Sequence, residues 1–420
     1  MVREERNIFK NIDWITVGIY LLLVLFGWMN IYAAVFNEQH DSIFDLSQRY
    51  GKQMIWILVS ILLALIILMT EPKVFNAFAF FIYGLSILSL FLVLFIGKEV
   101  SGSKSWIDLG GFDLQPSEFA KIAVNLAIAR HLSSLNIRME DLRTRITTFF
   151  LIGLPVILIL LQDDTGSALV FTAFIIVLYR EGLSGNVLII GGLVIILFIL
   201  ALMVDKWIII AFLALIALIW FSQIRKNRRD IVSLLGLFLL VAGFVYSVDF
   251  AFHHVLDVHH KERINVLIGK EVDLKGAGYN VNQSKIAIGS GRIIGKGFLQ
   301  GTQTKYNFVP EQSTDFIFCT IGEEWGFIGS VLTIALFIIL FIRILNIAER
   351  QRSAFSRIYG YGVASVFFFH FLVNIGMTIG LAPVIGIPLP FISYGGSSLF
   401  AFTIMLFIFI RMDANRLQLL

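Results

Sequence analysis

Charged residues are scarce in this chain. Only 15% of its 420 residues are Asp, Glu, Lys or Arg, whereas 58% are hydrophobic. A soluble domain is usually about one quarter charged, so this composition excludes an ordinary water-soluble protein. The net charge of +4 is also too small to indicate nucleic-acid binding. We therefore expect much of the chain to face lipid.

Other common features are missing too. Cysteine occurs once, at Cys319, which excludes an internal disulfide and leaves the redox compartment open. The N-terminus has no A-x-A cleavage site, and Arg3 and Lys10 precede a long apolar run, so we expect a retained first helix with a cytoplasmic start. The sequence has no recognisable soluble domain or repeat, and we predict one transmembrane domain over residues 1–420.

Long apolar runs make up most of the chain instead. A helix needs about 20 apolar residues to cross a bilayer, and its backbone groups must bond internally in lipid. Together with two weaker stretches, 116–133 and 166–180, these apolar runs predict an all-α polytopic membrane protein with about 10–12 transmembrane helices. The other predicted spans are residues 15–35, 53–70, 75–97, 147–161, 187–204, 207–221, 231–250, 327–343, 362–382 and 398–411.

The basic residues orient this bundle. Short cytoplasmic loops are enriched in Lys and Arg, which places the linker 134–146 and the turn Arg343–Arg357 inside. The segment 98–115, the hairpin tip Gln162–Thr165 and a large polar loop over 251–315 then fall outside. Polar residues within membrane helices usually mark functional sites. All candidate sites lie toward this outer face, so we expect the chemistry there.

The first candidate site begins a helix. Pro116 suits the first helical turn, and Glu118 suits its positive end. Glu118, Lys121 and Asn125 are spaced i, i+3, i+7 and therefore share one face. This face is either a charged cavity for an anionic headgroup or a structural ion pair between two helices.

The hairpin tip is the second candidate. Its adjacent carboxylates, Asp163 and Asp164, could hold a cation or a sugar hydroxyl. They are equally typical of turn formation and helix capping.

The third candidate is the stretch 276–315. Its repeated glycines allow close backbone approach, and Lys285, Arg292, Lys296 and Lys305 alternate with amide and hydroxyl side chains. This mixture suits a diphosphate and sugars, and the alternative is a loop that only covers the bundle. It is not a Walker or dinucleotide pattern.

Asp315 ends this stretch and begins an apolar helix. It is either a helix N-cap or a general base. Glu323 lies about two turns further on a similar side of the helix, whereas Glu324 points away, so Glu323 is the better candidate for facing a polar cavity.

Two further segments carry helix-breaking or polar residues. The glycines and prolines of Asn374–Pro383 and Leu389–Ser398 break helices near the membrane face, which is tolerated only where protein or water covers the backbone. These segments should line a cavity, as a hinge or as a substrate contact. His253, Asp257 and His260 share a helical face that permits a metal site, but no further ligand motif supports one, and we interpret them as the start of a polar loop.

Together these motifs resemble the SEDS family (shape, elongation, division and sporulation proteins). Its members carry a Trp before a Q-P-S-E-x-x-K helix start, a Q-P-D-L-G-T tip, a G-x-G-Y loop ending in P-E-x-x-T-D-F, and an L-P…S-Y-G-G-S-S segment. The sequence of the loop is similar to that of the RodA-like elongation branch of the family. The matching residues are Trp106, Gln115–Lys121, Gln162–Ser167, Gly276–Ser284, Pro310–Phe316 and Leu389–Ser398.

The resemblance implies an inverting peptidoglycan glycosyltransferase that polymerises lipid II, the undecaprenyl diphosphate-linked disaccharide-pentapeptide, into glycan strands. Asp315 would be the general base for the acceptor sugar hydroxyl, which is typically worth about 10²–10⁴ in rate. A divalent cation, Mg²⁺ or Mn²⁺, could assist the leaving diphosphate. Substrate contacts are expected from Trp106, Glu118, Lys121, Asp164, Lys285, Lys296, Lys305, Glu311, Glu323 and Ser393.

The resemblance also implies a place and a partner. We expect a multi-pass protein of the bacterial inner (cytoplasmic) membrane, in contact with membrane lipid, whose active face is extracytoplasmic and which works with a class B penicillin-binding protein transpeptidase. Two alternatives stay open: a lipid II flippase, and a non-catalytic scaffold for the transpeptidase.

This chain departs from the family pattern at several positions. Asp163 and Thr165 replace Pro and Leu, Arg292 replaces Gly, and Gln312-Ser313 replaces x-His. Family members usually have ten spans, so twelve would imply an extra hairpin within 187–250.

Overall fold

The computed structural model describes most of the chain as two compact units. Unit 1 takes the chain up to Leu183 and again from Asn280, and unit 2 spans Ser184–Tyr279. The prediction of one domain over 1–420 stays a prediction. The described residues are 11–36, 42–100, 102–108, 110–135, 137–223, 227–255, 261, 277–306 and 308–416.

Unit 1 is built from helices and one small sheet. Its first part contains α1 (Trp14–Val35), α2 (Arg49–Met69), α3 (Pro72–Ala77), α4 (Ala79–Ile96), β1 (Lys98–Val100), β2 (Ser103–Asp108), β3 (Asp113–Leu114), α5 (Pro116–Leu132), α6 (Leu142–Leu160), α7 (Thr165–Val170), the 3₁₀ turn η2 (Phe171–Ala173) and α8 (Phe174–Arg180). Its second part contains α13 (Ala277–Ser290), α14 (Thr302–Lys305), α15 (Ile317–Glu324), α16 (Gly326–Glu349), α17 (Ala354–Thr378) and α18 (Gly396–Ala414).

Ten helices in the described part of the chain are long and apolar enough to cross a membrane: α1, α2, α4, α6, α9, α10, α11, α16, α17 and α18. Two shorter helical segments, α5 and Thr165–Arg180, add to these. The prediction of an all-α bundle with about 10–12 transmembrane helices is therefore confirmed. Each helix forms where an apolar run lets the backbone bond to itself while its side chains face lipid or protein.

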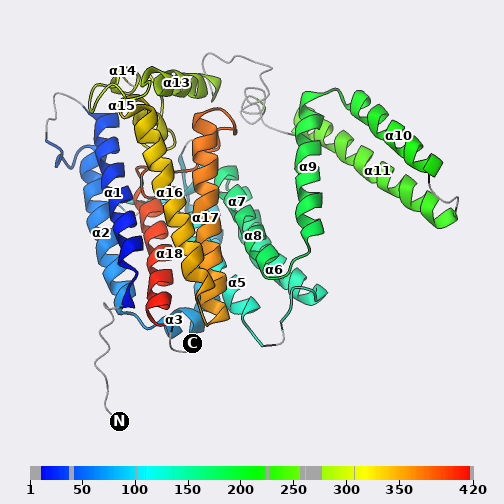
Figure 1. The fold of residues 1–420 in the computed structure, drawn as a ribbon, viewed down its shortest axis with the longest axis horizontal. Helices are drawn as coiled ribbons and strands as arrows, with labels where there is room; N and C mark the ends of the chain where they lie inside the picture. The colour runs from blue at the N-terminus through cyan, green and yellow to red at the C-terminus, as the bar shows by residue number, and fades with distance from the viewer. Residues whose placement is uncertain are drawn as a thin grey trace, which may run out of the picture. The chain divides into compact units, whose positions relative to one another are not determined.

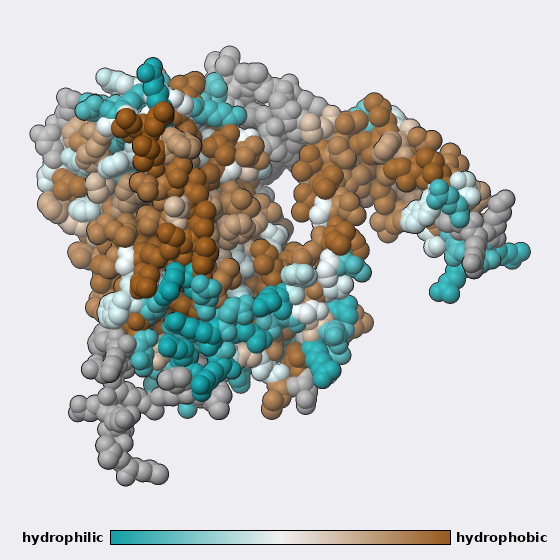
Figure 2. Space-filling model, in the orientation of Figure 1, coloured by the Kyte–Doolittle hydropathy of each residue, from teal (hydrophilic) through white to brown (hydrophobic). Residues whose placement is uncertain are grey.

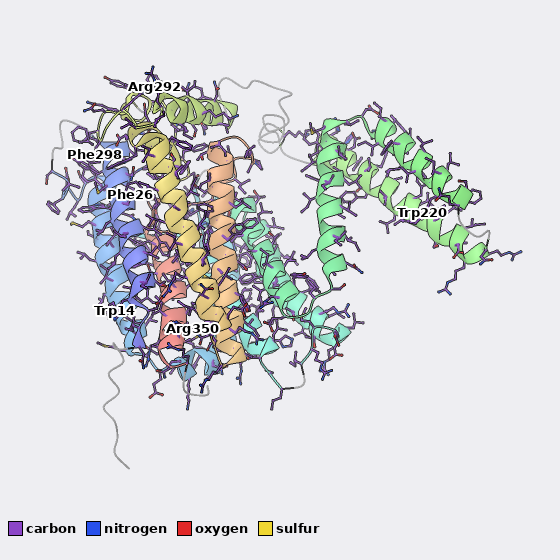
Figure 3. The ribbon with its side chains drawn as sticks, in the orientation of Figure 1. Trp14, Phe26, Trp220, Arg292, Phe298 and Arg350 are labelled. Atoms are coloured by element: carbon purple, nitrogen blue, oxygen red, sulfur yellow. The ribbon has the colours of Figure 1, made fainter. Side chains whose placement is uncertain are left out.

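The centre of unit 1 is α18, which is almost wholly buried and packs against α2, α5 and α17. Helices α13, α14 and α15 gather at one end of this unit, and α3 lies at the other (Figure 1). Arg292 and Phe298 mark the first end, whereas Trp14 and Arg350 mark the opposite end (Figure 3). On the face shown in Figure 2, a hydrophobic band separates these two polar ends, as expected for a unit that crosses a bilayer.

The segment predicted at 98–115 folds as an antiparallel three-stranded sheet, in the order β1-β2-β3. Trp106 pairs with Lys98, and Ile107 pairs with Leu114. The sheet adjoins the tip of the 147–180 hairpin, because the Lys104 N–H donates to the Gln162 carbonyl over 3.0 Å. Periodicity did not predict this sheet because its strands are short.

Unit 2 contains α9 (Gly185–Met203), α10 (Lys206–Gln223), α11 (Arg228–Phe250) and the π-helical turn η3 (Ala251–Val255). A small core around Ala201, Ile209 and Val245 holds the helices together. Lys206 at the start of α10 pairs with Asp249 near the end of α11 at 2.7 Å. These three helices match the predicted spans 187–204, 207–221 and 231–250.

The predicted loop 251–315 contains regular structure in its described part, including η3, α13 and α14. Residues 256–260, 262–276 and 307 lie outside the described residues, and with them Asp257, His260 and the Gly276 that begins the family motif.

Candidate active site

Asp315 stands in the turn that leads into α15. The N-cap position of this helix is Phe316, not Asp315, so the N-cap interpretation of Asp315 does not apply. The Asp315 side chain is partly exposed, whereas the next five residues are buried. A carboxylate in this position is accessible to a substrate hydroxyl.

The backbone on both sides of this carboxylate is held by side chains from the fourth candidate segment. Ser393 Oγ donates to the Thr314 carbonyl over 2.6 Å, and the Tyr394 N–H donates to the Ser313 carbonyl over 2.9 Å. Asn374 Nδ2 donates to the Asp315 carbonyl over 2.8 Å. Three successive carbonyl groups of the turn are thus fixed.

Ser393 and Asn374 also bind the backbone of residues 387–389. Ser393 Oγ accepts from the Leu389 N–H at 2.8 Å, and Asn374 Nδ2 donates to the Ile387 carbonyl at 2.7 Å. Ser393 is only 4% exposed, so its hydroxyl positions the turn. The described contacts of both side chains are to backbone groups, and a hinge or a substrate contact at this segment stays a prediction.

Arg49, at the start of α2, is a site residue that the sequence analysis missed. Its Nη1 donates to Ser313 Oγ over 2.7 Å and lies 3.4 Å from Glu311 Oε2. The guanidinium also covers the Tyr394 ring, 5.8 Å from its centroid. Its side chain is 44% exposed. The signal available in the sequence was a basic residue in a loop on the outer side, whereas most Lys and Arg lie in the short inner loops.

The hairpin tip lies beside Asp315. A Cβ atom on Gly166 would come within 2.0 Å of the Ile385 carbonyl oxygen, and one on Gly386 would lie 3.5 Å from Asp315 Oδ2. Residues 385–386 therefore separate the tip from the carboxylate. Asp164 caps α7 by accepting from the Ser167 N–H at 2.9 Å, and it also accepts from Gln115 Nε2 at 3.0 Å.

Glu118 and Lys121 form a buried ion pair, with 2.8 Å between Oε1 and Nζ. They are 3% and 0% exposed. Lys121 Nζ also lies 2.9 Å from His370 Nε2 on α17. Asn125, the third residue of this face, donates to the Tyr359 carbonyl. The face therefore joins α5 to α17, and a role of Glu118 and Lys121 in binding an anionic headgroup stays a prediction. His370 was missed, although an ionisable residue inside an apolar span is itself a signal.

Glu323 and Lys296 belong to a different cluster. Glu323 is 0% exposed, and its carboxylate accepts from Lys296 Nζ at 2.6 Å and from the N–H groups of Thr302, Gln303 and Thr304. Burial alone would raise the pKa of this carboxyl, but these hydrogen bonds outweigh it and hold the pKa at about 2. Glu323 anchors the 295–305 loop and does not face an open polar cavity, which differs from the prediction.

The remaining predicted substrate residues lie around these clusters. Trp106 is half-buried on β2, which packs against α4 and α5. Lys285 is exposed on α13 and lies against Gly380. A Cβ atom added to Gly380 would be only 2.4 Å from the Lys285 ammonium. Lys305 covers the Phe36 ring, and Glu311 accepts from Thr314 Oγ1. Their roles in binding substrate stay predictions.

A resident metal site is not evident. Among the described residues, no three His, Cys, Asp or Glu side chains come together as ligands. Mg²⁺ usually binds through one or two carboxylates together with substrate phosphates. The described residues therefore provide no cluster of three such ligands, and a cation that binds together with the diphosphate stays a prediction.

The chain is similar to known proteins over nearly its whole length. The family model of the FtsW, RodA and SpoVE proteins, described as cell cycle proteins, matches residues 13–418. Peptidoglycan glycosyltransferase RodA of Treponema pallidum is 32% identical, covering 98% of this chain and 99% of that protein. Peptidoglycan glycosyltransferase MrdB of Escherichia coli K12 is also 32% identical, over 90% and 88%.

Solved structures share the fold. A chain from work on structural coordination of polymerization and crosslinking by a peptidoglycan synthase complex has a TM-score of 0.71 at 25% identity, over 97% of this chain and 99% of that chain. The rod shape determining protein RodA of Thermus thermophilus has a TM-score of 0.63 at 24% identity, over 97% and 98%. The chain therefore belongs to the FtsW, RodA and SpoVE family, which is the SEDS family that its motifs resemble.

Proposed function

We propose that this protein is a peptidoglycan glycosyltransferase that polymerises lipid II into glycan strands during cell elongation. Two relatives at 32% identity, matched over most of their length, bear the name peptidoglycan glycosyltransferase. The observation that carries the proposal is Asp315, a partly exposed carboxylate whose backbone is held by Ser393 and Asn374.

In this proposal the Asp315 carboxylate takes the proton of the acceptor sugar hydroxyl. The oxygen then attacks the anomeric carbon of the donor, the bond from that carbon to the diphosphate oxygen breaks, and undecaprenyl diphosphate leaves with its electron pair. The new glycosidic bond has inverted configuration. The acceptor proton stays on Asp315 until solvent removes it. General base help of this kind is typically worth about 10²–10⁴ in rate.

Positive charge near the turn would stabilise the leaving diphosphate. Arg49 is held against the Asp315 turn and is 44% exposed, so its guanidinium can bind phosphate oxygens in two places at once. Lys296 is less suited because its ammonium is held by the buried Glu323 and by Thr302, whereas the partner of Arg49, Glu311, is exposed. A divalent cation at the diphosphate stays a prediction.

We place the Asp315 end outside the bacterial inner membrane. The opposite end of unit 1 carries the basic turn around Arg350 and the C-terminal end of α18 with Arg411, and the positive-inside rule assigns such residues to the cytoplasm. We also propose a class B penicillin-binding protein as partner, supported by the neighbouring structure of a synthase complex that both polymerises and crosslinks.

The test is glycan synthesis by the purified protein supplied with lipid II. We expect Asp315→Asn to lower the rate about 10²- to 10⁴-fold. Asp108→Asn is the matched control, because Asp108 is an exposed carboxylate on β2 and its amide should leave the rate unchanged. Unchanged synthesis by Asp315→Asn would exclude the base assignment. Lipid II transport without synthesis by the unmodified protein would favour a flippase, and neither activity would favour a scaffold.

A further inference from the structure

His370 is a buried histidine that the proposed reaction does not use. It lies in the α17 span and is 1% exposed. Its Nε2 is 2.9 Å from Lys121 Nζ, and its Nδ1 is 3.1 Å from the Pro388 carbonyl oxygen. The edge of its ring meets Phe402, with the centroids 4.8 Å apart.

These partners define the tautomer. A lysine ammonium can only donate and a carbonyl oxygen can only accept. His370 must therefore accept at Nε2 and donate from Nδ1–H, which makes it a neutral imidazole with one fixed proton. A packing histidine needs only to fill its space. This one joins α5 to the segment 385–394 with both nitrogens.

The segment that His370 holds is the one that fixes Asp315. Pro388 stands between Ile387, whose carbonyl shares the Asn374 amide with the Asp315 carbonyl, and Leu389, whose N–H donates to Ser393 Oγ. Ser393 Oγ in turn donates to the Thr314 carbonyl. A shift of Pro388 would therefore disturb Asn374 and Ser393, two of the three groups that hold the Asp315 turn.

Behind His370 the chain of contacts continues into the bundle. Lys121 pairs with Glu118, whose second oxygen, Oε2, is buried without a hydrogen-bond partner. An ammonium shared by a carboxylate and an imidazole has little freedom, because moving it would leave buried polar groups without hydrogen bonds. The Lys121 ammonium thus keeps Nε2 of His370 as an acceptor and the imidazole proton on Nδ1, where it reaches Pro388.

We propose that His370 is a positioning residue: its Nδ1–H holds the Pro388 carbonyl, and thereby the segment that fixes the general base Asp315, while Lys121 keeps the proton on Nδ1. This inference rests on the proposed function. A base that is misplaced by about 1 Å can lose about 10²-fold in rate. His370 therefore affects the chemical step without touching substrate.

Three substitutions separate the two hydrogen bonds. His370→Asn places an amide N–H near the original Nδ1 and keeps the donor to Pro388. His370→Gln places an amide oxygen near the original Nε2 and keeps only the acceptor for Lys121. His370→Phe keeps the ring and its contact with Phe402 but loses both bonds.

The measurement is kcat and KM for lipid II. We expect His370→Phe and His370→Gln to lower kcat about 10- to 100-fold at unchanged KM, and His370→Asn to recover most of kcat. Phe368→Leu is the control, since Phe368 is an exposed residue of the same helix and its kcat should stay as in the wild type.

Two results would overturn this inference. One is equal impairment of the Asn and Gln variants, because the loss of kcat would then not depend on the bond to Pro388. The other is a raised KM at normal kcat in any of the three. If His370→Phe does not fold, the comparison of Asn with Gln still decides. Normal kcat in Asp315→Asn would instead remove the proposed base, whatever the His370 variants do.

Discussion

At the residue scale, Asn374 binds two carbonyl oxygens with one amide group, those of Asp315 and Ile387. Replacing it with Leu, which has a similar shape, leaves both carbonyls without this donor. We expect Asn374→Leu to lower kcat about 10- to 100-fold, because the proposed base, Asp315, loses a support. The melting temperature should also fall, because each unpaired carbonyl costs about 1–3 kcal/mol.

The assay pairs glycan synthesis with thermal unfolding in detergent. Asn346→Leu is the control, because Asn346 is exposed on α16 and its loss should change neither value. A normal kcat with a lowered melting temperature would show that Asn374 supports the fold and not the base.

A second prediction concerns how stability depends on pH, and it rests on Glu324. Burial raises its pKa from 4.5 to about 7, and the N–H groups of Leu299 and Gly301 only partly offset this effect. The folded protein thus holds the Glu324 proton more tightly than the unfolded chain does. The resulting stability is present below pH 4.5 and is lost as the pH rises through about 7, by up to about 3 kcal/mol.

Glu324→Gln should remove that loss, since a neutral amide carries no proton to lose. We expect its melting temperature to exceed that of the wild type at pH 8 and to approach it at pH 5. Other groups titrate in this range as well, so the difference between the two proteins is the quantity to follow. A difference that does not change with pH would contradict the assignment.

At the scale of elements, the hairpin tip shows how closely two segments meet. Gly166 leaves no room for a side chain, because a Cβ would lie 2.0 Å from the Ile385 carbonyl oxygen. Gly166→Ala should therefore push the 385–394 segment away and abolish most glycan synthesis. The matched change Gly153→Ala in α6 meets no atom within 4 Å and should raise stability slightly, since Ala favours a helix over Gly. Equal activity of both variants would contradict this packing.

Departures from the family pattern have a local explanation in these elements. Arg292 stands where the family usually has Gly, and its φ of +51° lies in the left-handed region that glycine enters most easily. Asp163 stands where the family has Pro, yet its φ is +58°, which a proline ring does not allow. The tip of this chain therefore turns differently from that of a Pro-containing relative.

The sequence predicted helices far better than contacts. Apolar runs located the spans because lipid imposes one rule on every helix, and the predicted 15–35 corresponds to α1 at Trp14–Val35. The prediction was less accurate for α17, expected at 362–382 and found at Ala354–Thr378. Its first residues, such as Tyr359, are polar or aromatic but buried within protein, and Gly380 with φ +79° follows its end.

The site was only partly predictable for a related reason. Asp315, Ser393 and Lys121 stood in recognisable motifs. Arg49 and His370 did not, and they reach their partners across 264 and 249 positions of the chain. No pattern along one sequence specifies such pairings, because they depend on how α2, α5 and α17 pack together.

At the scale of the whole molecule, unit 1 has two chemically different ends. Backbone-binding side chains surround a partly exposed carboxylate at the Asp315 end. Arginine–carboxylate pairs dominate the other, such as Arg350 with Asp413 and Arg357 with Glu181. This asymmetry supports the proposal that the protein acts on one side of a membrane, as a polymerase of an exported substrate requires.

Sidedness gives the most direct measurement. The protein is reconstituted in vesicles, sorted by which end faces outward, and given lipid II from outside only. We predict glycan chains where the Asp315 end faces the substrate, and a rate lower by about 10²–10⁴ for Asp315→Asn in the same orientation. Equal synthesis by the Asp315→Asn protein, or synthesis only when the Arg350 end faces the substrate, would contradict an outward-facing aspartate base.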